Sequence, residues 1–113
     1  MATSASRKAR SRETERTAAA RLRELYPAAV AVPSALSGVD VLNTPGLAVE
    51  VKARRDLNLP AWLRQADKRQ GQGLPVVIHR PDGYGPESVG VWPVTMTFDA
   101  FMALLKEAGY GGE

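Results

Sequence analysis

Three charged side chains have a spacing that could bring them together at one end of a β-hairpin. Residues 47–52 (LAVEVK) predict a strand that places Glu50 and Lys52 on one face, because successive side chains alternate. Asp40 lies on the preceding predicted strand, across a short turn. Neighbouring carboxylates repel each other unless a cation lies between them, and a hard divalent ion such as Mg²⁺ takes oxygen ligands. The set indicates a metal-dependent reaction; a salt bridge on the exposed face of the hairpin is the simpler alternative.

A third acid, Glu15, lies on a predicted helix over residues 12–26. It precedes Ala18 by three residues and Leu22 by seven, so it continues the apolar stripe that this helix would bury. Glu13 is about 200° further round the helix and is expected to face solvent. Because a buried carboxylate needs a partner, Glu15 is a candidate member of the same site.

The elements that must position these residues follow the order α-β-β-β-α-β-β-α. The sequence predicts helices over residues 12–26, 56–70 and 97–109, and strands over 29–34, 37–43, 47–54, 74–80 and 89–94. Turn chemistry at Asn43-Thr44-Pro45-Gly46 would join the second and third strands as a hairpin. We therefore expect an α/β fold with a mixed sheet of about five strands flanked by helices.

The last predicted helix is well marked. Thr97 is a suitable N-cap, and the apolar stripe that follows comprises Phe98, Phe101, Met102, Leu105 and Ala108. We interpret this stripe as core or as a dimer contact. Trp62 and Trp92 are expected to be structural, and His79 is expected to be structural or to lie on the rim of a site.

Length and composition exclude several classes of function. The chain has 113 residues, which suits one domain, and it has no cysteine and one histidine. These counts exclude disulfide frameworks, thiol nucleophiles and zinc sites that need thiolates or two histidines. No apolar run approaches the ~20 residues that span a bilayer, and no signal peptide is evident. We therefore expect a cytoplasmic protein, in the cytosol or the nucleoid.

The formal net charge of +3 is distributed unevenly along the chain. Residues 1–25 hold seven basic and three acidic residues, whereas the remainder holds eight basic and nine acidic residues. We expect a flexible basic arm over residues 1–10 and a single folded domain over residues 11–113. Basic arms bind nucleic-acid phosphates with an affinity that falls as salt rises; a solubilising tail is the alternative.

The candidate residues also follow one another in a family-like order, namely Glu15-Arg16 on the first helix, then Gly38-Val39-Asp40, Glu50-Val51-Lys52 and Gln65. This pattern resembles the PD-(D/E)XK nuclease superfamily, and within it most resembles the archaeal-type Holliday-junction resolvases and their phage-encoded relatives. The resemblance covers roughly residues 10–80. One departure is Val39, which stands where the family has proline.

The resemblance implies a restriction-endonuclease-like sheet and a Mg²⁺-dependent endodeoxyribonuclease, with Mn²⁺ as a substitute metal. Such a hydrolase would cut phosphodiester bonds in four-way or other branched DNA during recombination, in the nucleoid or in the cytoplasm of a phage-infected cell. The implied roles are metal ligation by Asp40, Glu50 and the carbonyl of Val51, water activation by Lys52, a second metal or its waters at Glu15, and fixed geometry through Gln65. A homodimer is also implied, since two sites could cut a two-fold symmetric junction in a paired way.

Basic residues flank these positions and would contact DNA phosphates: Arg7, Lys8, Arg10, Arg12, Arg16, Arg54, Arg55, Arg64 and Lys68. For Arg54, and for the cluster around Arg64, a solvated charge is the alternative. Two other functions stay open, namely a non-catalytic basic nucleic-acid-binding protein and a PD-(D/E)XK nuclease that acts on other DNA substrates. The nuclease is favoured because a protein that only binds gains nothing from acids that face phosphates.

Overall fold

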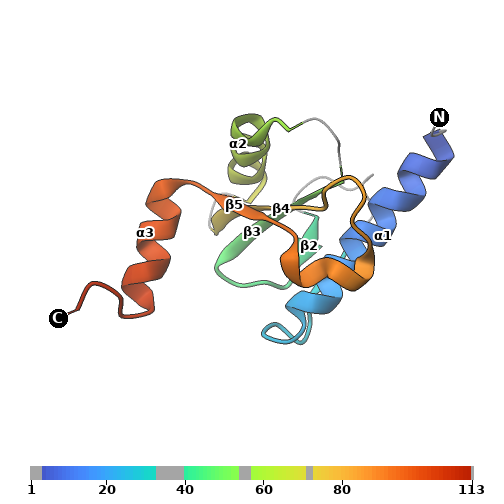
Figure 1. The fold of residues 1–113 in the computed structure, drawn as a ribbon. Coiled ribbons are helices and arrows are strands. Elements are labelled where there is room, and N and C mark those ends of the chain that lie inside the picture. The colour runs from blue at the N-terminus through green and yellow to red at the C-terminus, as the bar shows by residue number, and fades with distance from the viewer. Residues whose placement is uncertain (1–3, 33–39, 54–56, 71–72, 113) are drawn as a thin grey trace.

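The computed structural model describes residues 4–32, 40–53, 57–70 and 73–112, and it describes only the backbone of Ser4 and of residues 67–70. In chain order the elements are α1 (Ser4–Leu22), β1 (Val30–Ala31), β2 (Val41–Leu42), β3 (Leu47–Lys52), α2 (Leu59–Gln70), β4 (Leu74–His79), the 3-10 helix η1 (Pro86–Val91), β5 (Val94–Met96) and α3 (Phe98–Glu107). Figure 1 shows the sheet at the centre, with α2 over it, α1 across one end and α3 at the other. None of the helices in these described ranges is both long enough and apolar enough to cross a bilayer.

The five strands form one mixed sheet in the order β1-β2-β3-β4-β5. β3 and β4 are parallel and in register from Leu47 opposite Leu74 to Lys52 opposite His79, and the other pairs are antiparallel. α2 is the crossover that a parallel pair requires, because two parallel strands cannot be joined by a tight turn. The expectation of an α/β fold with a five-stranded mixed sheet and flanking helices is therefore confirmed.

The main core lies between α1 and one face of the sheet. Val49 and Val51 of β3 belong to the same buried cluster as Ala18 and Ala19 of α1, whose small side chains allow the helix to approach the sheet closely. Alternation along β3 directs Glu50 to the opposite face, which α2 covers. β3 is consequently buried on both faces, as expected for a strand in the middle of a sheet between two helices.

A tight turn and a close backbone approach set the register of the central strands. The turn between β2 and β3 contains Asn43 with φ 67° and Gly46 with φ 90°, so its left-handed conformations fall on residues that tolerate them. Gly73, just before β4, lies against the first residue of β3. A Cβ atom added there would be 2.6 Å from the carbonyl carbon of Leu47, so only glycine allows this close approach.

The structure differs from the sequence-based expectations at two places. α1 begins at Ser4, so residues 4–10 are helical and do not form the expected flexible arm. Arginine, lysine and alanine all favour helix, and neither glycine nor proline interrupts this stretch. The strand predicted over residues 89–94 is wrong, because η1 occupies Pro86–Val91 and β5 begins at Val94. Local hydrogen bonds from both the amide and the hydroxyl of Ser88 to the Gly85 carbonyl oxygen close this segment into turns instead.

α3 extends away from the rest of the protein. It lies at the opposite end of the molecule from α1, and the longest dimension is 53 Å against 27 and 25 Å for the other two (Figure 1). The predicted N-cap is confirmed, because the Thr97 hydroxyl oxygen accepts a hydrogen bond from the Ala100 amide at 3.1 Å. β5, which leads into α3, is an edge strand of the sheet.

Candidate functional site

The β2–β3 hairpin brings Asp40 beside β3. The Asp40 amide donates to the Val49 carbonyl oxygen at 3.0 Å, and the Asp40 Oδ2 accepts from the Val51 amide at 2.7 Å. The register of Val41 opposite Val49 produces this alignment. The carboxylate of Asp40 is therefore held against the strand that carries Glu50, which is the juxtaposition that the hairpin predicts.

Lys52 lies between Glu50 and α2. Its Nζ is 3.2 Å from the Glu50 Oε2 and donates to the Gln65 Oε1 at 3.2 Å. The same ammonium lies 5.8 Å from the ring centroid of Trp62, one turn before Gln65 on α2. Glu50 is fully buried and Lys52 is largely buried, so the pair is shielded from bulk solvent and from salt. The crossover helix thus supplies the side chains that orient the lysine.

Glu15 reaches this region from α1 and is only 9% exposed. Burial raises the pKa of the Glu15 carboxyl from 4.5 to about 7, and the negative charges of Asp40 and Glu50 contribute to the rise. The positive charges of Arg12 and Lys52 oppose it. The three acids are therefore within electrostatic reach of one another, in a place where negative charge is costly.

The three carboxylates do not converge on one point. α1 packs on the face of β3 that carries Val49 and Val51, whereas Glu50 points to the face that α2 covers. α1 also passes the end of the sheet where β3 and β4 finish (Figure 1). Across the described ranges, no three acidic or histidine side chains lie close enough together to hold a metal ion. In this arrangement a cation could have two of these carboxylates as direct ligands at most, with Glu15 in an outer position.

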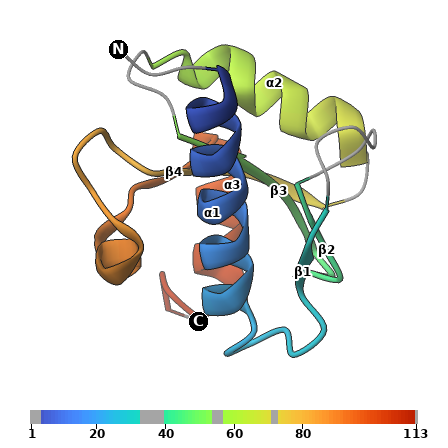
Figure 2. The same ribbon diagram turned by 90° about the vertical axis from the view of Figure 1, so that its right-hand side faces the viewer.

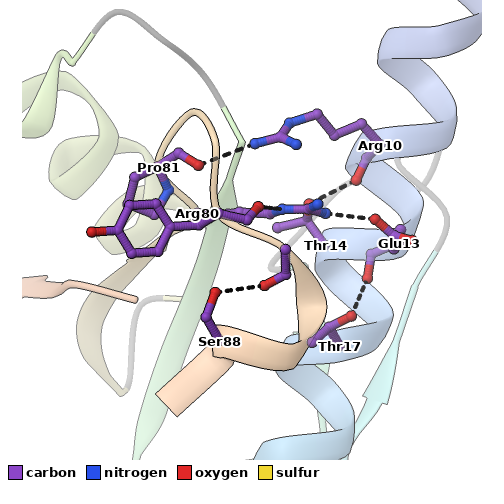
Figure 3. Close-up of polar contacts among 9 residues, drawn as sticks. Arg10, Glu13, Thr14, Thr17, Arg80, Pro81 and Ser88 are labelled. Atoms are coloured by element: carbon purple, nitrogen blue, oxygen red, sulfur yellow. Dashed lines mark hydrogen bonds and ion pairs between the residues drawn. The ribbon is translucent and has the colours of Figure 1, made fainter. Parts of the chain in front are cut away.

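A buried arginine that sequence reasoning missed ties α1 to the segment after β4 (Figure 3). Arg80 is only 6% exposed, and its Nη1 lies 2.7 Å from the Glu13 Oε1 and 3.2 Å from the Thr14 hydroxyl oxygen. Its Nε donates to the Tyr84 carbonyl oxygen at 2.7 Å. Its guanidinium carbon lies 5.7 Å from the ring centroid of Trp92, within the range of a cation–π contact. One side chain thus joins three segments of the chain.

A second contact reinforces this connection. Arg10 of α1 donates from Nη2 to the Pro81 carbonyl oxygen at 3.2 Å, and its own carbonyl oxygen accepts from the Thr14 hydroxyl at 2.7 Å (Figure 3). Because Thr14 directly precedes Glu15, the contacts made by Arg80 and Arg10 hold the turn of α1 that carries the candidate acid. The only signal in the sequence is an arginine at the end of an apolar strand, directly before a Pro-Asp-Gly turn.

The outcome for Glu13 follows from this contact. Its side chain is 53% exposed, in agreement with the expectation that it faces solvent, but its carboxylate is paired with Arg80. Helical phase predicts the direction of the side chain correctly and carries no information about a partner 67 residues away.

The two tryptophans are buried, as expected of structural residues. His79 is buried as well, with its ring centroid 5.7 Å from that of Trp62, and is therefore not a rim residue.

The residues expected to contact DNA lie in different environments in the structure. Arg7, Lys8, Arg12 and Arg16 are exposed on α1, and Arg64 is exposed on α2. Lys8, Arg12 and Arg16 follow one another at intervals of four, so they form a basic stripe along one side of α1. Arg10 is half-buried and occupied with Pro81. Arg54, Arg55 and the side chain of Lys68 lie outside the described residues. Figure 2 shows how α1, which carries the stripe, runs along most of the height of the molecule.

Comparisons with known proteins identify no relative. No protein-family model matches the chain, and no curated protein or solved structure matches it either. The functional assignment therefore depends on the residues and geometry of the site itself: one carboxylate directly before β2 and one on β3, a lysine oriented by a helical glutamine, and a third acid on α1.

Proposed function

We propose that this protein is a metal-dependent endonuclease for branched DNA, with the four-way junction as its preferred substrate. The observation that carries the proposal is the partly buried group formed by Asp40, Glu50, Lys52 and Gln65. A largely buried lysine, a carboxylate on β3 and a carboxylate directly before β2 resemble the catalytic group of the PD-(D/E)XK nucleases in both residue type and position relative to the strands. A restriction-endonuclease-like arrangement of the mixed sheet is part of the same proposal.

The donor set fits a hard divalent cation, Mg²⁺ or Mn²⁺. Carboxylate and carbonyl oxygens are the ligands such ions prefer, and the concentration of negative charge around Glu15 is relieved when a cation is nearby. Asp40, Glu50 and the carbonyl of Val51 would hold the ion, while Glu15 would hold a second ion or its waters. When bound, such an ion lowers the pKa of a coordinated water and neutralises charge on the phosphate.

The remaining residues orient the reactants. Lys52 carries a positive charge next to Glu50, where it can steady an attacking water and the negative charge that develops on the phosphate. Gln65 restricts the ammonium by accepting one of its hydrogen bonds. The stripe of Lys8, Arg12 and Arg16 would bind backbone phosphates and guide the strand toward the site without reading its sequence.

The substrate class follows from symmetry and charge. A four-way junction has two-fold symmetry, so paired cuts in opposing strands need two copies of this site. We accordingly propose a homodimer that acts on DNA during recombination, in the nucleoid or in the cytoplasm of a phage-infected cell. A nuclease for forks or for duplex DNA would use the same catalytic group, and the substrates compared below distinguish these cases.

The test is cleavage of synthetic four-way junction, fork and duplex DNA of the same sequence, with Mg²⁺, Mn²⁺ or EDTA. The diagnostic variant is Asp40→Asn, because the amide oxygen of asparagine can still accept the hydrogen bond from the Val51 amide. Glu24→Gln, which removes an exposed carboxylate, is the matched control. We expect wild type and the control to nick the junction symmetrically near the crossover, and Asp40→Asn to bind the junction without cutting it.

Three outcomes would contradict the proposal in whole or in part. If the wild-type protein cuts none of the substrates with either metal, yet binds the junction in a gel-shift assay, it is a non-catalytic nucleic-acid-binding protein. If Asp40→Asn cuts as fast as wild type, the nuclease activity does not belong to this site. Equal cutting of plain duplex would retain the chemistry and overturn the preference for junctions.

A further inference from the structure

α3 presents its apolar stripe to solvent instead of to the core. Phe98, Phe101 and Met102 are 76%, 48% and 53% exposed. Ala100, on the other side of the same helix, is buried and faces the protein. Figure 1 shows α3 away from α1 and α2, so neither of those helices covers the stripe. The stripe keeps its helical spacing of three and four residues, which is typical of a helix face that packs against another helix.

The charges that border this stripe are arranged for pairing with a second copy in the antiparallel sense. Asp99 and Lys106 are exposed, lie seven residues apart and therefore border the same side of the stripe, near opposite ends of the helix. When two identical helices pack antiparallel about a two-fold axis, the same side of each faces the other. Asp99 of one copy then lies opposite Lys106 of the other, and the contact occurs twice. A parallel pair would instead place these two borders on opposite edges of the contact, so that Asp99 and Lys106 of the two copies would not meet.

We propose that α3 packs antiparallel against α3 of a second copy of this chain, with Met102 close to the two-fold axis. Phe98 of each copy would then lie near Leu105 of the other, so that the aromatic rings leave water together. The charge pattern is self-complementary, as a two-fold contact requires. Glu107 is on the far side of the helix, about 180° from Phe98, and would stay outside the contact.

The size of the patch suits a weak dimer. Two such faces would bury roughly 1,000 Å² in total, which is about the lower limit for a specific protein interface. Exposed apolar patches of this size on a monomer often mark an interaction site. We therefore expect a dimer that forms at micromolar concentration and dissociates on dilution.

The pairing is argued from α3 alone, and only its consequence, paired cutting of a junction, rests on the proposed function. It can therefore succeed or fail independently of the nuclease proposal. A dimeric protein that cuts no DNA would uphold the α3 contact and overturn the nuclease. A monomeric protein that cuts junctions would uphold the nuclease chemistry and overturn the α3 contact, together with the proposed homodimer.

The experiment measures the association of the full chain by sedimentation equilibrium across a range of micromolar concentrations. Asp99→Lys and Lys106→Asp are compared singly and together, since each single change creates like-charged neighbours and the double change restores opposite charges. We expect each single variant to weaken the dimer by on the order of tenfold or more and the double variant to recover most of the affinity. The control is Glu107→Lys, which alters charge on the same helix away from the contact.

All three positions are exposed, so we expect the variants to keep the fold, which circular dichroism can check. Wild-type protein that remains monomeric at every concentration would overturn the proposal, as would a double variant weaker than both single variants. Monomeric wild type that instead binds vesicles containing phosphatidylglycerol would assign this face to a membrane surface and would equally overturn it.

Discussion

Replacing Glu15 by glutamine should stabilise the metal-free protein above neutral pH. Its carboxyl has a pKa of about 7 in the folded state against an ordinary value of 4.5, chiefly because it is buried and also because Asp40 and Glu50 are near. Between pH 4.5 and about pH 7 the folded state retains a proton that the unfolded state has released. The free energy of unfolding of the wild type therefore falls as pH rises through this window, and the loss is complete above about pH 7.

The magnitude follows from the two pKa values. Their difference corresponds to at most about 3.4 kcal/mol, at ~1.36 kcal/mol for each pH unit. Glu15 keeps some contact with solvent, which screens the neighbouring charges, so we expect a gain of about 1–3 kcal/mol for Glu15→Gln at about pH 8. Near pH 4.5 the gain should be close to zero, because the wild-type carboxyl is then protonated in the folded state. Glutamine preserves the shape of the side chain and removes only the charge.

The assay is urea unfolding followed by far-UV circular dichroism at about pH 5 and about pH 8, with EDTA present. Glu24→Gln, an exposed carboxylate just beyond the same helix, serves as the control and should change little at either pH. A gain for Glu15→Gln that is the same at both pH values would refute the argument from burial and charge. With Mg²⁺ in place of EDTA, the wild type should gain more stability than the variant, because a ligand that binds only the folded state raises its stability.

Three further changes probe the fold and the basic surface. Arg80→Met should destabilise the protein by about 2–4 kcal/mol in thermal or urea unfolding, since it removes three hydrogen bonds, one of them to a carboxylate. A loss of stability below half of this range would show that the arginine contributes little. Gly73→Ala should cost about 1–3 kcal/mol, because the new methyl group would meet the backbone of Leu47, and an unchanged urea midpoint would contradict that close approach. Replacing Arg7 and Lys8 by glutamine should weaken binding to any DNA, measured by fluorescence anisotropy. The slope of log affinity against log salt should fall by roughly one for each phosphate that the variant no longer neutralises. An unchanged slope would exclude these residues from the interface.

The local part of the candidate site could be predicted from the sequence. Asp40, the turn that contains Asn43 and Gly46, and Glu50 with Lys52 lie within a short stretch, so strand alternation and turn chemistry suffice to bring them together. Glu15 on a buried stripe and Gln65 on the second helix were predictable for a similar reason, since helical phase determines which side of a helix is buried.

Expectations failed where several local structures were compatible with the same residues. The alternation in residues 89–94 suits a strand, yet hydrogen bonds within Pro86–Val91 turn that segment into a 3-10 helix. The basic N-terminal residues suit an arm in solution, yet residues 4–10 continue α1 because nothing in them interrupts a helix. In both cases the residue pattern is compatible with the expected structure, and the competing local structure is more favourable.

The sequence by itself determined the hairpin that aligns Asp40 with Glu50 and Lys52, because its contacts are close along the chain and depend on the alternation of side chains and a short turn. Only the tertiary structure decided that Arg80 holds α1 through Glu13, that Glu15 approaches the other acids without joining them, and that the stripe of α3 faces solvent. The physical reason is that these outcomes depend on where distant segments pack, and the spacing of residues along one segment contains no information about its neighbours in space.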